Sequence, residues 1–520
     1  MACDVDSVAL CPFEGPEKLL EIWFAPGPSY VPDASTAHNG RSGLRAVERK
    51  VWEDMLDIVK CKILSVIYGE EMDAYLLSES SFFISPHRLI LKTCGTTLNL
   101  LGLPRILAIA REHAGLPAVY QCFYSRKAFM FPDKQLGPHR DWGLEVEFLD
   151  RLFEHGSAYT VGKVNQHGDH WLLYMTSPED MSSGSGTDMS SLASSLCISD
   201  AVVKTKMRTR EENWAIVGRA GLYTLPLLPP SQQDYTIEIL MTHLSPRARA
   251  AFFTPDSVDP CCTDGEHSPG VYALNLSDDL GITDIFPRHR TELDAYSFTP
   301  CGYSANALIH WGDAPGAPQL VDEDLDDSEK KIGEGYYTIH VTPEEGWSYA
   351  SFECNVPLAS RRKCTNDRGE ATDNADDIPD LRTLIRRVVR IFEPGKITMT
   401  LFVQSRGDGY DDEEDEEDDG EKEIAVEAAQ RAFKAALTRL PKASRGSSPS
   451  TAVNHETGGP ARITLQNGSE DTSVMSFAAN HGDGLGCAWA PVYDRVYKRM
   501  DKINYEFGGY DLAFASFEAL

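Results

Sequence analysis

The stretch Tyr75–Thr97, which reads YLLSESSFFISPHRLILKTCGTT, limits what this chain can fold into more than any other. It places two hydroxyls, Ser80 and Ser81, directly after the carboxylate of Glu79, and then runs through apolar, strand-forming residues to a single thiol at Cys94. On the residues alone, such a Ser-Glu-Ser-Ser cluster is typical of a polar turn between two strands. It also permits chemistry, because the Ser80 hydroxyl lies next to the Glu79 carbonyl along the chain.

A serine that attacks the preceding carbonyl can cut its own chain, and good orientation can lower such a barrier by about 7–11 kcal/mol. Attack by Ser80 on Glu79 would turn the amide into an ester, and loss of the Ser80 Cα proton would then release the Glu79 carboxylate. The dehydroalanine left at position 80 would hydrolyse to a pyruvoyl group. The products would be a small chain of residues 1–79 and a large chain of residues 80–520. The large chain would begin with an electron sink of the kind that enzymes usually take from pyridoxal phosphate.

The charge balance limits the partners of the chain. It has 520 residues, and 49 basic against 79 acidic side chains give a net charge of −30. Phosphate backbones would be repelled, whereas small cations would be attracted. The 12 cysteines show no CxxC pairs, which favours a reducing cytosol over a disulfide framework. With no signal segment and no apolar run of membrane-spanning length, we expect a cytoplasmic protein that binds neither nucleic acid nor membrane.

Several motifs follow one another in a recognisable order. FEG-x-EKLLE-x-WF opens the folded part at Phe13, LSESS and KTCGTT follow, and FYSRK and YYTIHVTPEEGWSYASFECN come later. Together they resemble the eukaryotic S-adenosylmethionine decarboxylase proenzymes, a pyruvoyl-dependent family, and the resemblance runs with interruptions from Phe13 to Phe517. It implies an α+β fold with one domain over residues 1–520. That fold is a four-layer αββα sandwich: two antiparallel sheets packed face to face, helices outside, and two similar halves.

The same resemblance implies the reaction. Cleavage between Glu79 and Ser80 would create the pyruvoyl group, which would form a Schiff base with the amine of S-adenosylmethionine and release carbon dioxide. Neither a metal nor pyridoxal phosphate would take part, and the product would supply aminopropyl groups for spermidine and spermine. Cys94 is the implied proton donor, since an ordinary thiol pKa of about 8.5 suits donation near neutral pH. By itself, Cys94 could equally be a small buried apolar side chain.

Other residues receive roles by position in the family motifs. Ser304 and His340 are implied to assist Ser80 during cleavage, although a lone histidine on a strand is more often structural. Phe13 and Phe298 would stack on the adenine of the substrate. The remaining implied residues are Leu77 and Glu79 in the substrate site, Glu344 on the ribose hydroxyls, and Glu14 and Glu17 beside the active site.

The segment DYTIEILM alternates cleanly, so that Asp234, Thr236 and Glu238 share one face of a strand. This pattern also fits a half-exposed strand with its polar face in water. The resemblance instead implies an interior site for the diamine putrescine, and buried carboxylates without a cation would cost several kcal/mol each. The implied site consists of Asp234, Thr236, Glu238 and Glu353, with Phe123, Phe402 and Tyr510 as its aromatic lining. Plant members that need no diamine carry basic residues where this chain has Leu19, Phe123 and Phe402, so we expect a putrescine-responsive enzyme.

Residues 406–469 include DDEEDEEDD, which cannot fold alone because its charges repel and it has no apolar surface to bury. We predict an acidic, low-complexity, disordered insertion here, similar to fungal members of the family, with a short alanine-rich helix near residues 424–440. Animal members dimerise, and we expect a homodimer of processed protomers. Two other interpretations stay open: a catalytically silent paralogue that activates a true decarboxylase, and an uncut thiol hydrolase using Cys94 and His340.

Overall fold

The computed structural model describes residues 13–36, 41–78, 80–164, 170–176, 234–262, 265, 267–311, 333–358, 378–405, 425–438, 495–507 and 509–520. All of these residues belong to one compact unit, made of residues 1–439 and 495–520. Residues 440–494 do not belong to that unit and lie outside the described part.

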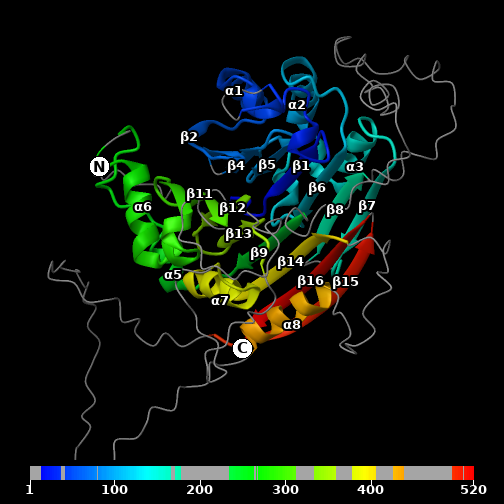
Figure 1. The fold of residues 1–520 in the computed structure, drawn as a ribbon. Helices are drawn as coiled ribbons and strands as arrows, with labels where there is room; N and C mark the ends of the chain where they lie inside the picture. Colours follow the sequence, from blue (N-terminus) through cyan, green and yellow to red (C-terminus); the bar gives the residue numbers. More distant parts are fainter. Residues whose placement is uncertain are drawn as a thin grey trace, which may run out of the picture. The chain divides into compact units, whose positions relative to one another are not determined.

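The described strands form two eight-stranded antiparallel sheets (Figure 1). The first sheet has the order β2-β3-β4-β5-β1-β6-β8-β7 and the second has the order β10-β11-β12-β13-β9-β14-β16-β15. Adding eight to every strand number of the first order gives the second, so the predicted similarity of the two halves is confirmed. The strands of the first sheet are β1 (Lys18–Trp23), β2 (Ile63–Tyr68), β3 (Asp73–Leu77), β4 (Ser80–Ile84), β5 (Arg88–Thr93), β6 (Gln121–Lys127), β7 (Gly156–Val161) and β8 (Trp171–Thr176). Those of the second are β9 (Tyr235–Thr242), β10 (Thr291–Ser297), β11 (Tyr303–Trp311), β12 (Gly333–Thr342), β13 (Tyr349–Cys354), β14 (Lys396–Gln404), β15 (Tyr497–Phe507) and β16 (Tyr510–Ala519).

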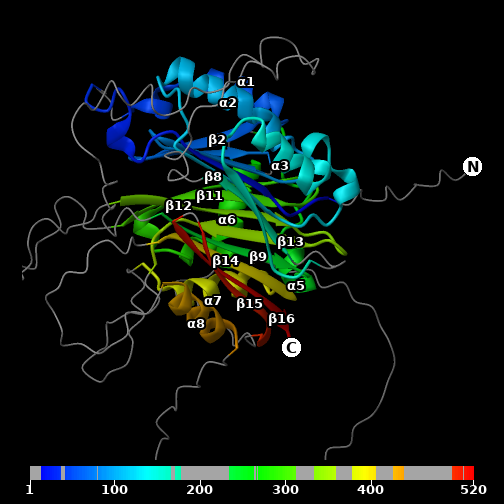
Figure 2. The same ribbon diagram turned by 90° about the vertical axis from the view of Figure 1, so that its right-hand side faces the viewer.

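Helices cover the outer face of each sheet (Figure 2). On the first sheet they are α1 (Arg49–Ile58), α2 (Asn99–His113) and α3 (Trp142–Asp150); on the second they are α5 (Pro246–Ala250), α6 (Pro269–Leu280), α7 (Leu381–Phe392) and α8 (Ala425–Leu437). The short 3-10 helices are η1 (Pro28–Tyr30), η2 (Gly43–Ala46), η3 (Pro132–Lys134), η4 (Gly137–Arg140), η6 (Ile282–Asp284) and η7 (Arg288–Arg290). Helix α7 shows why they pack there: Leu381, Leu384, Ile385, Val388 and Val389 recur at helical spacing and are buried against the sheet. No helix among the described residues is both long and apolar enough to cross a bilayer.

Alternating side chains divide each strand between two cores. In β1, Leu20 and Ile22 lie in the core under the helices of the first sheet, whereas Leu19 and Trp23 face the second sheet. On that inner side, Phe83 of β4 stacks on Tyr336 of β12 with ring centroids 4.1 Å apart. The order of layers is therefore helices, sheet, sheet, helices, and the predicted αββα sandwich is confirmed.

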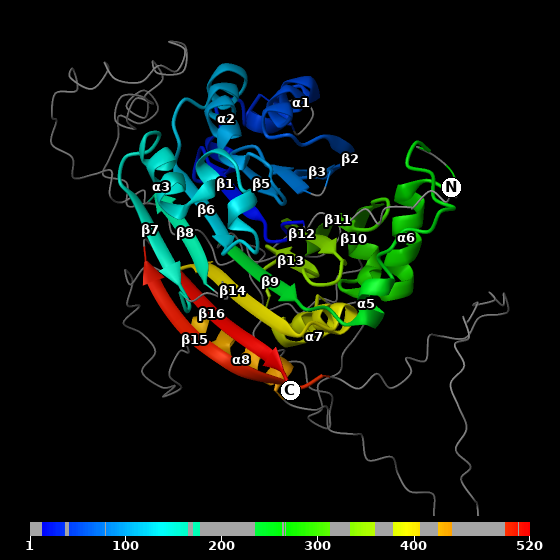
Figure 3. The same ribbon diagram turned by 180° about the vertical axis from the view of Figure 1, so that it is seen from behind.

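Helix α8 lies inside the predicted insertion 406–469 but belongs to the folded unit. Its buried residues Val426, Ala429 and Phe433 join the core between the second sheet and α7. The side-chain amide of Gln430 donates to the carbonyl of Phe514 in β16 at 2.9 Å. Seen from behind, α8 runs along β15 and β16 (Figure 3). The sequence boundary of the insertion was therefore too wide, because it included an amphipathic helix that the sheet needs as cover; residues 406–424 and 439–469 lie outside the described part.

Candidate active site

Ser80 is the first residue of β4 and is fully buried. It pairs with Leu77 of β3 on one side and with Thr93 of β5 on the other. Because side chains alternate along a strand, Ser80 shares the helix-covered face with Phe82, and its Oγ lies 3.8 Å from the sulfur of Cys61. Leu77, an expected substrate residue, also lies in that helix-side core. Glu79 lies outside the described residues, so the predicted scissile bond is not described.

The next residue, Ser81, points to the opposite face and reaches the predicted processing pair. Its Oγ lies 2.9 Å from His340 Nε2, and His340 Nδ1 lies 2.9 Å from Ser304 Oγ. The same Oγ lies 2.6 Å from Asn306 Oδ1 and 2.8 Å from Thr338 Oγ1. The structure thus brings Ser304 and His340 together, but the serine of β4 that contacts His340 is Ser81 and not Ser80. Sequence reasoning missed Ser81, although the alternation of β4 contained the signal.

The hydrogen-bond partners of His340 limit where its proton can lie. The side-chain amide of Asn306 donates to the Tyr75 carbonyl at 3.1 Å, which turns its Oδ1 toward Ser81. With Ser81 donating to Asn306, its oxygen is available to His340 Nε2, which also lies 3.2 Å from Thr338 Oγ1, and a proton on Nε2 would leave Nδ1 to accept from Ser304. Burial, with a smaller effect from the Lys92 charge, lowers the pKa of His340 to about 3. The imidazole is therefore neutral at physiological pH.

Cys94 follows β5 directly and is buried, one residue after the partner of Ser80. A tight turn at Gly95, with φ +61°, follows it, and the Gly95 N–H donates to the Glu14 carbonyl at 2.9 Å. A Cβ on Gly95 would lie only 3.1 Å from the Phe13 ring. The turn needs glycine for both reasons. It joins Phe13, Glu14 and Cys94 in one neighbourhood beside Ser80.

The other predicted residues differ in whether their side chains already have partners within the described part of the protein. The Glu14 carboxylate accepts from the backbone N–H groups of Met130 and Phe131, both at 2.7 Å, and burial raises its pKa. Glu344 is half-buried, and its Oε2 is buried without a hydrogen-bond partner among the described residues. Such an oxygen can accept a hydrogen bond from a ligand hydroxyl. The Phe298 ring contacts Tyr296, with centroids 5.0 Å apart.

Carboxylates gather between the sheets beyond this site. Glu353 accepts from Lys92 Nζ and from the Tyr336 hydroxyl, both at 2.6 Å. Glu238 lies 3.8 Å from the same Lys92 and accepts from the Trp171 indole at 3.2 Å. Lys92 thus serves two carboxylates that were predicted to bind a diamine.

A second cation lies at the other end of this acidic space. Arg88 lies 3.3 Å from Glu21 and 3.2 Å from Asp234, and it stacks over the ring of Trp23 at 4.7 Å. The three side chains predicted as an aromatic lining lie together: the ring centroids of Phe402 and Tyr510 are 4.5 Å apart, and that of Phe123 lies 5.4 and 5.1 Å from them. Thr236 lies opposite Phe402 in the strand register.

Among the described residues, acidic side chains outnumber basic ones between the two sheets. Glu17, whose carboxylate accepts from the hydroxyls of Tyr349 and Ser351, joins the other carboxylates. Burial raises the pKa of Glu21 to about 8 and that of Glu238 to about 7, and it also raises the pKa values of Glu17 and Asp234. Five carboxylates (Glu17, Glu21, Asp234, Glu238 and Glu353) therefore share this interior with three cations (Arg88, Lys92 and Lys127), of which Lys127 donates to Thr398 Oγ1 of the second sheet at 3.1 Å. Sequence reasoning missed Glu21, Arg88 and Lys92; the charged residues alternating with Leu89 and Leu91 in β5 were the available signal.

Comparison with known proteins identifies the family. A family model described as adenosylmethionine decarboxylase matches residues 11–435. The chain belongs to the adenosylmethionine decarboxylase family. It is 35% identical over 391 residues to a Xenopus laevis S-adenosylmethionine decarboxylase proenzyme, and this alignment covers 75% of this chain and 83% of the relative.

Other members of the family come from distant organisms. The Saccharomyces cerevisiae proenzyme is 32% identical over 412 residues (76% of this chain, 82% of the relative), and the Oryza sativa subsp. japonica proenzyme is 33% identical over 407 residues (77% and 75%). A solved Trypanosoma brucei AdoMetDC-delta26 monomer aligns with 84% of this chain and 99% of its own, at 15% identity and a TM-score of 0.39, too low to add to the assignment. Among the described residues, no group of three or more His, Cys, Asp or Glu side chains could hold a metal ion.

Proposed function

We propose that this member of the adenosylmethionine decarboxylase family cuts itself between Glu79 and Ser80 and then removes carbon dioxide from S-adenosylmethionine. The observation that carries the proposal is the position of Ser80, buried at the start of β4 and paired with Thr93, which directly precedes Cys94. After cleavage, residue 80 would be the first of the large chain, next to the proposed proton donor. This arrangement supports a pyruvoyl group at residue 80.

Processing would use only groups of the chain and water. The Ser80 oxygen bonds to the Glu79 carbonyl carbon while the C–N bond breaks, and the nitrogen leaves as an amine that stays on residue 80. A base then takes the Ser80 Cα proton, and the Glu79 carboxylate departs with the electrons of the C–O bond. Water finally replaces the nitrogen, which leaves as ammonia. His340 is neutral and contacts the hydroxyls of Ser304 and Ser81, so its unprotonated nitrogen can accept a proton from either hydroxyl during processing.

The pyruvoyl group, once present on residue 80, supplies the electron sink for decarboxylation. The side chains of this protein would do the rest. Cys94 holds a proton on its sulfur for delivery to the substrate Cα, and Phe13, packed on the Gly95 turn, lies where an adenine ring could stack. Glu344 offers a buried, unoccupied oxygen to the ribose hydroxyls. Phe298 would contact the other face of the adenine.

Mass spectrometry of the purified chain tests the cleavage. A small fragment ending at Glu79 is expected, with a long fragment that starts with a pyruvoyl group and forms a covalent adduct when borohydride and S-adenosylmethionine are added. Ser80→Ala should stay uncut, whereas Ser81→Ala should still be cut. A fragment ending at Ser80 would instead assign the reaction to Ser81, whose hydroxyl contacts His340. An uncut wild-type chain would favour the thiol hydrolase, and a cut chain that releases no carbon dioxide would favour the silent paralogue.

We propose putrescine as the ligand of the space between the sheets. The excess of carboxylates over cations, the raised pKa values of these carboxylates and the Phe123–Phe402–Tyr510 cluster support a small dication with a hydrocarbon chain between its two charges. Added putrescine should raise both the cleavage rate and turnover, and Asp234→Asn should remove this response. The homodimer of processed protomers stays a prediction, which light scattering of the cleaved protein would test.

A further inference from the structure

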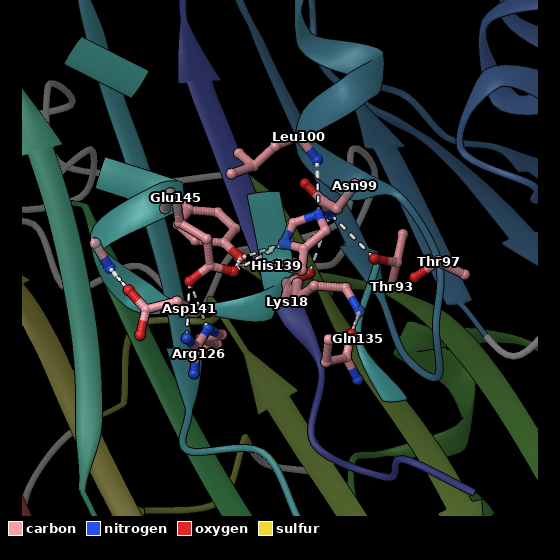
Figure 4. Close-up of polar contacts among 12 residues, drawn as sticks. Lys18, Thr93, Thr97, Asn99, Leu100, Arg126, Gln135, His139, Asp141 and Glu145 are labelled. Carbon is pink, nitrogen blue, oxygen red and sulfur yellow. Dashed lines mark hydrogen bonds and ion pairs between the residues drawn. The ribbon is translucent and has the colours of Figure 1, made fainter. Parts of the chain in front are cut away.

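Lys18 is a fully buried lysine that has no role in the reaction proposed above. It begins β1 on the side of the helices, and no carboxylate of the described residues lies within ion-pair distance of its ammonium. Its Nζ lies 3.5 Å from Gln135 Oε1 (Figure 4). It donates to the Gly95 carbonyl at 2.9 Å and lies 5.3 Å from the centre of the Phe129 ring. Burying an ammonium without an ion pair costs several kcal/mol. Stability alone therefore does not explain Lys18.

The charges around Lys18 connect it to Cys94. Burial lowers the pKa of Lys18 to about 8, and the groups that oppose this shift by their negative charge are Cys94, when its thiol is ionised, followed by Glu145 and Glu14. Arg126 adds to the lowering. Two of these groups already have other partners: Glu145 is bound by Arg126 at 2.8 Å and by the Tyr124 hydroxyl at 2.6 Å, and Glu14 by backbone N–H groups. His139, which also contacts Glu145, is kept neutral by burial, which lowers its pKa.

Hydrogen bonds hold the turn after Cys94 from several sides. The Gly95 carbonyl accepts from Lys18 and also from the Gln135 amide at 3.3 Å. The Asn99 amide donates to the Lys18 carbonyl at 3.2 Å and to Thr93 Oγ1 at 3.1 Å, so it joins β1 to the residue before Cys94 (Figure 4). Lys18 is thus the cationic member of a network that fixes the backbone on both sides of the thiol.

We propose that Lys18 is a positioning residue for Cys94: its ammonium fixes the Cys94–Gly95 turn and stabilises the thiolate that remains after the thiol has given up its proton. In that step the S–H proton goes to the substrate carbon, the electron pair stays on sulfur, and the thiolate later regains a proton from solvent. The role in turnover rests on the proposed function. The electrostatic coupling does not, because it exists in the uncut chain.

The coupling is tested in the full chain carrying Ser80→Ala, which needs no processing. Thiolate absorbance near 240 nm is titrated with and without Cys94→Ala, and the difference isolates this one cysteine among twelve. Lys18→Met, which removes the charge at similar volume, should move the titration to higher pH and reduce the thiolate fraction at pH 8 by about tenfold. Lys18→Arg should leave the titration close to that of the parent. Gln135→Met is the matched control, because it removes a hydrogen bond to the same carbonyl but no charge.

The proposal is overturned if Lys18→Met titrates like the parent, or if Gln135→Met moves the titration as far as Lys18→Met does. Should Lys18→Met fail to fold, Lys18→Gln, which keeps a donor toward Gly95, enters the same titration. In the processed enzyme, Lys18→Met should lower kcat by about tenfold and leave KM within twofold, since the charge acts on the proton donor and not on substrate contacts. If Lys18→Met shifts the titration in the Ser80→Ala chain but the chain with Ser80 intact is never cut, the proposed function is refuted and the coupling between Lys18 and Cys94 stands.

Discussion

The excess of carboxylates between the sheets predicts a specific pH dependence of stability. Burial raises the pKa of Glu238 from an ordinary 4.5 to about 7. A raised pKa in the folded state stabilises the protein below the unfolded pKa, and this contribution is lost as the pH rises through the folded value. Since a tenfold change in an equilibrium corresponds to about 1.4 kcal/mol, the charge on Glu238 should cost about 3 kcal/mol at pH 8. Glu238→Gln, which stays neutral, should avoid that cost.

Comparing the variant with the parent at two pH values isolates this effect. Buried histidines such as His340 also make stability depend on pH, but they are the same in both proteins and cancel in the difference. Both proteins carry Ser80→Ala, and urea unfolding measures their free energies of unfolding. Glu238→Gln should raise this free energy less at pH 5 than at pH 8, and the difference between the two gains should be up to about 3 kcal/mol. Glu393→Gln is a suitable control, since the pKa of that carboxyl is lowered below its ordinary 4.5, so both pH values lie above its titration and its effect on stability should be nearly equal at the two.

Putrescine should act on the same charges. A dication bound between the sheets offsets negative charge, and Glu21 and Glu238, whose pKa values are raised to about 8 and about 7, carry more of that charge at pH 8 than at pH 5. Putrescine should therefore stabilise the parent more at pH 8 than at pH 5. At pH 8 the stabilisation should be about 2.7 kcal/mol when putrescine is present at a hundred times its dissociation constant at that pH. Glu238→Gln should gain less, and butylamine, with one charge, should have little effect. A gain from Glu238→Gln that is equal at both pH values, or larger at pH 5, would refute the electrostatic argument.

Three further predictions concern single side chains. His340→Ala should slow cleavage by about 10²-fold or more, and Ser81→Ala should slow it less by breaking the link from His340 to β4, as followed by time-resolved denaturing electrophoresis. Glu344→Gln should raise KM by about 10-fold or more with a smaller change in kcat, because a charge-assisted hydrogen bond of about 1.5–3 kcal/mol is weakened; an unchanged KM would remove Glu344 from the substrate site. Lys92→Met should destabilise the fold by about 3–5 kcal/mol at pH 8, since Glu353 and Glu238 lose their shared cation, and the loss should shrink at pH 5; a loss that is independent of pH would contradict this account.

The sequence contained most of the fold and only part of the site. Alternation in segments such as Tyr235–Thr242 predicted strands, and the motifs predicted the sandwich. Which charges meet across the two sheets could not be predicted, because Lys92 and Glu353 lie 261 residues apart and only the packing of the sheets joins them. Local alternation was informative but unused at Ser80 and Ser81, whose opposite directions follow from the period of a strand. Helix α8 was missed as cover for the sheet because the acidic run before it dominates the composition.

The matching strand orders of the two sheets have a consequence for how this molecule could have arisen. Ser81 lies on β4 and His340 on β12, while Lys92 lies on β5 and Glu353 on β13, so each pair joins counterpart strands of the two halves. The arrangement is that of a symmetric homodimer whose subunits have been joined into one polypeptide. After such a fusion the two copies would be free to diverge, so that one could keep a nucleophile where the other acquired a base. Neither half expressed alone would carry a complete reaction centre, but the two halves mixed together could restore one.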